Sequence, residues 1–126
     1  MPTETPDRSG ILLPLRGEPS IIAAERSLYE QANRVCGGIV TQIPASEWKQ
    51  DRFHAMIASV QPKTEDAPVN ALASKVFGGP VHGTCILAKR PARDEDMYGT
   101  PHRADRYMQP FDPQTAREAL ASLMED

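Results

Sequence analysis

Two cysteines and three histidines are the soft-ligand candidates of this chain for a metal ion such as zinc, and the cysteines could also act as nucleophiles. A structural zinc site normally shows paired ligands, such as two cysteines separated by two residues. His82 and Cys85 are the closest pair here, and residues three apart on a strand point to opposite faces. The spacing therefore predicts no metal site, and nothing in the sequence indicates a cofactor. The five residues are Cys36, His54, His82, Cys85 and His102.

The cysteines do not stand out as catalytic thiols. Cys36 lies near the expected C-terminus of a helix, where the helix dipole disfavours a thiolate. Pairing of a thiol with a histidine depends on the fold and cannot be read from spacing. No acid–base pair, metal set or oxyanion loop can be named. We therefore predict that the protein is not an enzyme.

Two glycine pairs, Gly37-Gly38 and Gly78-Gly79, resemble parts of phosphate-binding loops but stand at the wrong helix ends. Phosphate-binding loops precede a helix, because free N–H groups and the positive end of the dipole lie there. Both glycine pairs follow an expected helix. They are therefore predicted to be helix C-caps.

Asn70 follows Pro68-Val69 and precedes Ala71–Phe77, a helical pattern of two turns. Asparagine is a preferred N-cap, because its side-chain oxygen accepts a hydrogen bond from an unpaired first-turn N–H. The rigid backbone before Asn70 would also allow its side chain to contact a ligand. We carry both roles as expectations, with the cap as the leading one.

The segment Pro91–Pro110 is the first place where we expect a partner to bind. A loop of about twenty residues without periodicity is uncommon in a compact domain and is often functional. Its arginines could hold an anion and its tyrosines could contact a protein, and a solvated loop of mixed charge is the alternative. Together with Asn70, the candidate contact residues are Tyr98, His102, Arg103, Arg106 and Tyr107.

Composition narrows the class of protein. The chain has 126 residues, a net charge of −3 and a scattered distribution of Lys and Arg, which argue for one domain and against nucleic-acid binding. The opening MPTETPDRSG does not resemble a signal peptide, and no apolar run reaches membrane-spanning length. The two cysteines are then expected to be reduced, in the cytoplasm.

The expected elements alternate in a simple order. Pro14 predicts that the first strand lies at a sheet edge or bends. Ser20–Ala24 fits a strand or the start of a helix, and we favour the strand because Ser27 and Glu30 form a capping box. The expected strands are Ile11–Leu15, Ser20–Ala24, Ile39–Ile43, Phe53–Val60 and a central, buried Val81–Ala88. The expected helices are Leu28–Cys36, Ala71–Phe77 and one that starts at Asp112-Pro113.

The order β-β-α-β-β-α-β-α predicts an α+β fold with a mainly antiparallel sheet. Residues 1–10 are expected to be a flexible tail and residues 11–90 the core. Residues 91–111 are expected to be a long polar loop, and residues 112–126 to be a C-terminal helix. A sheet face left uncovered by the short helices would favour a homo-oligomer.

Four short motifs resemble domain-of-unknown-function family 3846, a family of small phage and actinobacterial proteins. The motifs are ILLPLRGEP, NRVCGGIVTQI, PVNALA and VHGTCILAKR, and they span residues 11–90. The family has no established activity to transfer. The resemblance implies a phage or mobile-element setting, and residues 91–126 lie outside it.

These observations predict a small phage-type accessory protein that binds a host or phage protein without catalysis. In a second hypothesis, the protein binds or sequesters a small molecule such as a nucleotide signal, in a pocket near Pro68–Asn70. An enzyme of unknown reaction is the third. Neither a nucleic acid nor a membrane is an expected partner.

Overall fold

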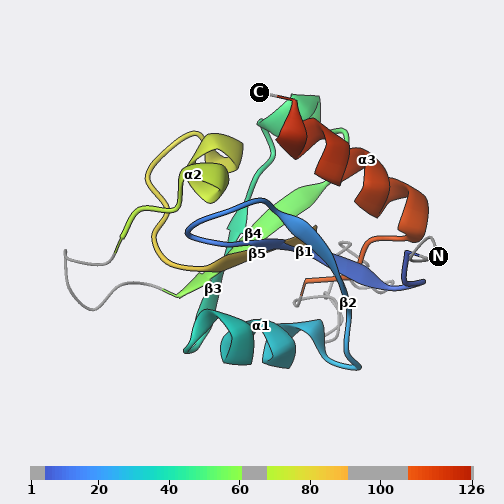
Figure 1. Ribbon diagram of the computed structural model, residues 1–126, viewed down its shortest axis with the longest axis horizontal. Coiled ribbons are helices and arrows are strands. Elements are labelled where there is room, and N and C mark those ends of the chain that lie inside the picture. Colours follow the sequence, from blue (N-terminus) through green and yellow to red (C-terminus); the bar gives the residue numbers. More distant parts are fainter. Residues whose placement is uncertain (1–4, 61–67, 91–107, 126) are drawn as a thin grey trace, which may run out of the picture.

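The computed structural model describes residues 5–60, 68–90 and 108–125. Its centre is a five-stranded antiparallel sheet with the strand order β2-β1-β5-β4-β3 (Figure 1). This is the α+β fold, with the element order, that the sequence predicts. The strands are β1 (Ser9–Leu13), β2 (Ser20–Ala23), β3 (Val40–Pro44), β4 (Ala55–Val60) and β5 (Cys85–Lys89). The helices are α1 (Leu28–Cys36), the short 3₁₀ helix η1 (Trp48–Asp51), α2 (Ala71–Phe77) and α3 (Pro113–Met124).

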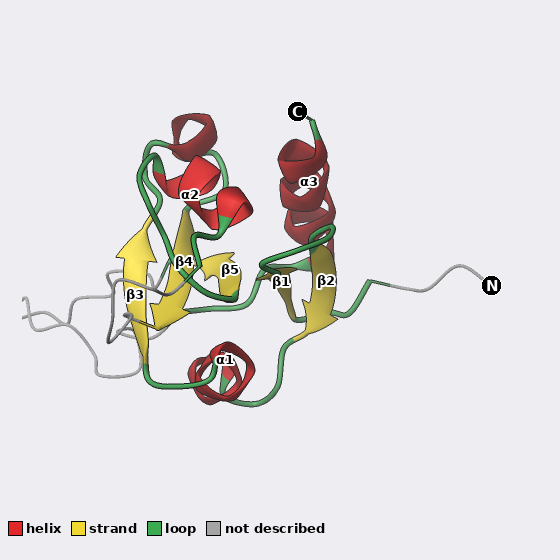
Figure 2. Ribbon diagram, turned by 60° about the vertical axis from the view of Figure 1, so that its left-hand side comes forward, coloured by secondary structure: helices red, strands yellow, loops and turns green. Residues whose placement is uncertain are grey.

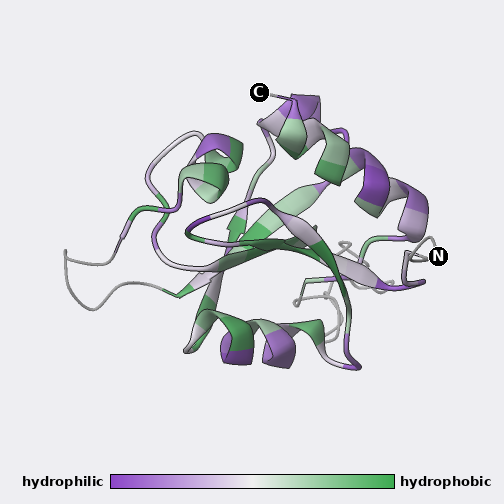
Figure 3. Ribbon diagram, viewed as in Figure 1, coloured by the Kyte–Doolittle hydropathy of each residue, from purple (hydrophilic) through white to green (hydrophobic). Residues whose placement is uncertain are grey.

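Helices cover both faces of the sheet. Figures 1 and 2 place α1 on one side and α2, η1 and α3 on the other. In Figure 3 the polar residues of α1 lie on the side turned away from the sheet. Within the described residues, each face of the sheet thus carries at least one helix.

Each side of the sheet has its own apolar core. Toward α1, Leu28 and Ala32 pack on strand residues that include Met56 and Ile86. Toward α2 and α3, a larger cluster surrounds the fully buried Phe111. Every residue of β5 except Lys89 is buried, because both faces of this strand are covered. The expectation of a central, buried strand here is confirmed.

The helix ends are those that the sequence predicts. Ser27 Oγ accepts a hydrogen bond from the Glu30 N–H at 3.2 Å, and Gly37 closes α1 in the left-handed conformation. Asp112 caps α3, with Pro113 in the first turn. Each such cap contributes about 1 kcal/mol to helix stability. The strand expected at Ser20–Ala24 is β2, which pairs with β1.

The expectation of an edge position for the first strand is wrong. β1 lies between β2 and β5 and pairs with both. Pro14 follows the last residue of β1, so its missing N–H removes no hydrogen bond from the sheet. Two other strands are shorter than expected: Phe53 and His54 form a turn before β4, and β5 starts at Cys85.

The end of the expected polar loop belongs to the core. Met108 and Phe111 are buried. Gln109 exchanges two backbone hydrogen bonds of 2.9 Å with Lys89, and Phe111 pairs in the same way with Ser9. Met108, Gln109 and Phe111 therefore extend the folded core beyond the boundary predicted at Arg90.

Candidate functional site

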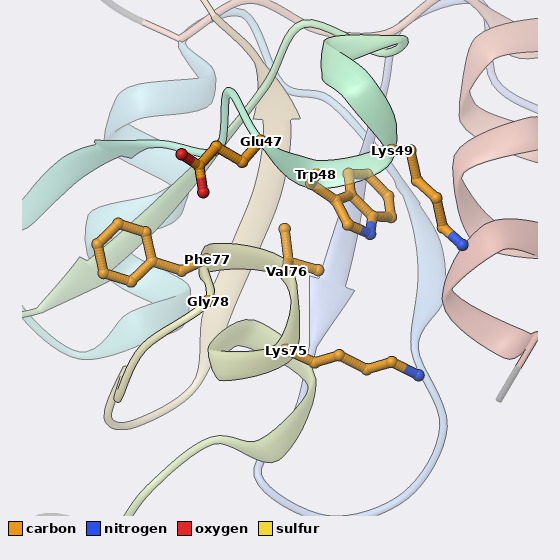
Figure 4. A pocket seen from close by; sticks show the side chains of 7 residues that line it. All are labelled: Glu47, Trp48, Lys49, Lys75, Val76, Phe77 and Gly78. Atoms are coloured by element: carbon orange, nitrogen blue, oxygen red, sulfur yellow. The ribbon is translucent and has the colours of Figure 1, made fainter.

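A shallow pocket opens between η1 and α2, on the sheet face opposite α1. Its volume is about 360 Å³. Trp48 and Val76 lie in the middle of the lining, with charged side chains around them (Figure 4). The lining residues are Glu47, Trp48, Lys49, Lys75, Val76, Phe77 and Gly78.

Trp48 is held by the turn that follows it. Its ring lies 5.2 Å from that of Phe53, centroid to centroid, and Phe53 is buried in the core. Lys49, Gln50 and Asp51 adopt left-handed backbone angles, with φ of 50°, 57° and 60°. A left-handed non-glycine residue costs about 1–2 kcal/mol, so this turn is strained and must be held by its surroundings.

Ion pairs hold this turn to its neighbours. Asp51 Oδ2 lies 2.5 Å from Arg90 Nη2, while Asp51 Oδ1 is buried without a hydrogen-bond partner. The Arg90 backbone N–H donates to the His54 carbonyl at 2.6 Å, and His54 Nδ1 lies 3.5 Å from Asp51 Oδ2. Arg52 also pairs with Glu118 of α3, at 3.6 Å. The turn is thereby fixed to the end of β5 and to α3.

The other wall of the pocket is the last turn of α2. Val76 is buried against the core, whereas Phe77 is 41% exposed. Gly78 caps α2 in the left-handed conformation, with φ 86°, so the chain turns away directly after Phe77. A phenylalanine this exposed beside a tryptophan is an apolar surface of the type found at the centre of protein interfaces.

The charges of the pocket are mixed. Glu47 lies on the side of Phe77, and Lys49 and Lys75 extend toward the opposite side (Figure 4). Lys49 Nζ lies 3.4 Å from Glu125 Oε2, near the C-terminus of α3. Both of these side chains are exposed, so the pair contributes little to stability and can exchange partners.

Asn70 is the N-cap of α2, as the sequence predicts. Its Oδ1 accepts from the Ala73 N–H at 3.0 Å, and its Nδ2 donates to the carbonyls of Leu13 and Gly83, both at 2.8 Å. The side chain is fully buried. The expectation that Asn70 also contacts a ligand has no support in this environment, because all its polar atoms are engaged inside the protein.

The other candidate residues, Tyr98, His102, Arg103, Arg106 and Tyr107, lie outside the described residues. The described chain on either side of them is fixed by the pairing of Lys89 with Gln109. The pocket also differs from the one expected near Pro68–Asn70. It lies at the opposite end of α2.

The two cysteines are protonated thiols at neutral pH. Burial, with a smaller effect of the nearby Cys85, raises the pKa of Cys36 to about 12. Burial likewise raises the pKa of Cys85 to about 11, against a lowering hydrogen bond from Ser59. Within residues 5–60, 68–90 and 108–125, no three potential metal-ligating side chains come together. No helix in these ranges is long and apolar enough to span a bilayer.

Sequence reasoning missed the pocket because its walls come from separate segments. A single tryptophan in a polar stretch was the available signal, since such a residue needs either a core or a partner to cover it. The turn that positions Trp48 has no glycine to mark its left-handed residues. A scan against protein-family models finds none that matches this chain, and searches of curated proteins and solved structures find no match either.

Proposed function

We propose that this protein acts by binding another protein, and that the partner covers the surface formed by Glu47, Trp48, Lys49, Lys75 and Phe77. We call this surface the Trp48 surface. The observation that carries the proposal is a pair of aromatic side chains in one open pocket with charged residues around it: Phe77, which is 41% exposed, and Trp48, which is partly buried against the core. Protein interfaces share this pattern of an aromatic centre and a polar rim.

The proposal keeps the accessory role predicted from the sequence, with a host or phage protein as the partner, in the phage or mobile-element setting that the family resemblance implies. It moves the principal contact from the segment Pro91–Pro110 to the Trp48 surface. The candidate residues of that segment remain a second proposed contact. Met108, near the end of that segment, is not a proposed contact, because it is buried in the core beside α1.

Binding without catalysis is favoured by the state of the nucleophiles. A thiol whose pKa lies near 11 or 12 supplies almost no thiolate at neutral pH. His54 faces Asp51 and Arg90, and these contacts fix the strained turn. The two thiols and the His54 imidazole therefore serve the folded structure, and none of them supports a catalytic role.

The experiment is affinity capture with matched variants. The protein and its Phe77→Ser and Ile39→Ser variants serve as baits in a lysate of the cells that harbour it, and captured proteins are quantified by mass spectrometry. Ile39 is a suitable control because it is 80% exposed, precedes β3 and does not line the pocket. A partner that is lost with Phe77→Ser and kept with Ile39→Ser supports the proposal. A partner retained by both variants contradicts it.

A second candidate function is the binding of a small anionic ligand with an aromatic ring, such as a nucleotide. The observation that favours it is the indole of Trp48 in the same pocket as the ammonium groups of Lys49 and Lys75. Titration with AMP and GMP, followed by the fluorescence of the single tryptophan, tests it directly. Saturable quenching that Lys75→Gln weakens would favour this function over protein binding.

A further inference from the structure

The charges that line the pocket are separated by sign. In Figure 4 the carboxylate of Glu47 lies on one side, near Phe77, and the ammonium groups of Lys49 and Lys75 lie on the other. Trp48 and Val76 occupy the space between them. All of these residues line one pocket, so a bound segment that crosses it meets a negative charge, an apolar centre and two positive charges in turn.

Such an arrangement selects by charge order. Opposite charges across an interface attract weakly when exposed, but a like charge at the wrong end is disfavoured as well. A segment with two acidic ends places a carboxylate beside Glu47, and one with two basic ends places a cation beside the lysines. Only a segment with unlike ends satisfies both sides of the pocket.

We propose that the Trp48 surface binds a peptide segment of its partner that carries a basic residue, an apolar residue and an acidic residue in order across the pocket. The basic side chain faces Glu47, the apolar one covers Trp48 and Val76, and the acidic one faces Lys49 and Lys75. This inference rests on the proposed function and deepens it, because it names the chemistry of the segment.

Lys49 is the residue that would bind the acidic end of the segment. Its partner within the protein, Glu125, lies 3.4 Å away, and the side chains of Lys49 and Glu125 are 37% and 66% exposed. An exposed pair of this kind is held weakly. A carboxylate of the partner can therefore replace that of Glu125 at little cost. The pair with Glu125 also shows that a carboxylate can lie beside the Lys49 ammonium group.

Three synthetic peptides test the charge order. Each has capped ends and a central leucine flanked by serines; the outer residues are Arg and Glu, Arg and Arg, or Glu and Glu. Binding is followed by the NMR signal of the Trp48 indole N–H during titration. The Arg and Glu peptide is expected to bind about two- to fivefold more tightly than either other peptide, the effect of one exposed charge pair.

Two variants test which end of the peptide lies beside Glu47 and which lies beside the lysines. Glu47→Gln should remove the advantage over the Glu and Glu peptide, and the double variant Lys49→Gln, Lys75→Gln should remove the advantage over the Arg and Arg peptide. Equal binding of all three peptides at Trp48 would overturn the charge order and leave the protein-binding function standing. No shift of Trp48 with any peptide would overturn the charge order, and a captured partner that also leaves the Trp48 signal unchanged would overturn the protein-binding function as well.

Discussion

The side-chain amide of Asn70 joins the start of α2 to the end of β1, through a hydrogen bond of 2.8 Å from Asn70 Nδ2 to the carbonyl of Leu13. The two residues are 57 positions apart in the sequence. A second hydrogen bond from the same nitrogen reaches Gly83, in the turn before β5. One buried amide thus fixes α2, which carries one wall of the pocket, to two strands of the sheet.

Replacement of Asn70 should therefore cost more than the loss of a helix cap. A cap alone predicts that Asn70→Ala costs about 1 kcal/mol and Asn70→Gly only a few tenths. With two buried carbonyls also left unpaired, both variants should lose about 2–4 kcal/mol in urea unfolding. Asn70→Asp is the sharper control. It keeps the oxygen that caps α2, but it replaces the donating nitrogen with an oxygen that cannot bond to the two carbonyls, so it should also lose stability. A stability of Asn70→Asp equal to that of wild type would show that only the cap matters.

The strained turn after Trp48 predicts a stabilising substitution. Gln50 is exposed and has φ 57°, a conformation that glycine adopts freely. Gln50→Gly should raise the free energy of unfolding by up to about 1 kcal/mol. Gln114→Gly, in the first turn of α3, is the matched control and should lower it by roughly 0.5–1 kcal/mol. Destabilisation by both variants would mean that Gln50 is not strained in solution.

Arg90 should affect the Trp48 surface although it does not line the pocket. Its guanidinium pairs with Asp51, the last residue of the strained turn. Arg90→Gln should let the turn relax and should shift the fluorescence maximum of Trp48 toward that of an exposed indole. Arg117→Gln, on the exposed side of α3, serves as the control and should leave the spectrum unchanged. An unchanged spectrum for Arg90→Gln as well would show that Arg90 does not help to position Trp48.

The buried thiols predict slow alkylation and a loss of stability at high pH. Above pH 9.0, the ordinary pKa of a cysteine thiol, the unfolded chain loses thiol protons that the folded chain keeps. The folded state then binds more protons, so the free energy of unfolding falls as the pH rises toward the raised values. A Cys36→Ala, Cys85→Ala variant should show a smaller decline between pH 9 and 11. Iodoacetamide should modify Cys85, which is buried in the native protein, far more slowly at pH 8 than in urea, and similar rates would contradict its burial.

Much of the fold could be predicted because local signals bound its helices. Ser27 and Gly37 delimit α1, and Asn70 and Gly78 delimit α2, each by a side-chain or backbone hydrogen bond that the residue type favours. The interior place of β1 could not be predicted, because the position of Pro14 relative to the ladder depends on the register with β2 and β5.

The pocket could not be predicted from the sequence either, because it also depends on tertiary contacts. No residue type in the sequence Lys49-Gln50-Asp51 marks a left-handed turn, and the contacts that hold it, such as Arg90, come from a distant strand end. The four residues at the end of α2 that complete the pocket, Lys75 to Gly78, were predicted as helix and cap, and that prediction is confirmed. Their role in a surface emerges only when η1 is placed beside them.

The most direct test of the proposed function is a ¹⁹F NMR measurement on Trp48 in the complex. The chain contains one tryptophan, so 5-fluorotryptophan labelling gives one signal at the centre of the Trp48 surface. When a captured partner, unlabelled, is added, this signal should shift and lose its sensitivity to the exchange of H₂O for D₂O, because the partner covers the ring. A complex that forms with the signal and its solvent sensitivity unchanged would show that the partner binds elsewhere.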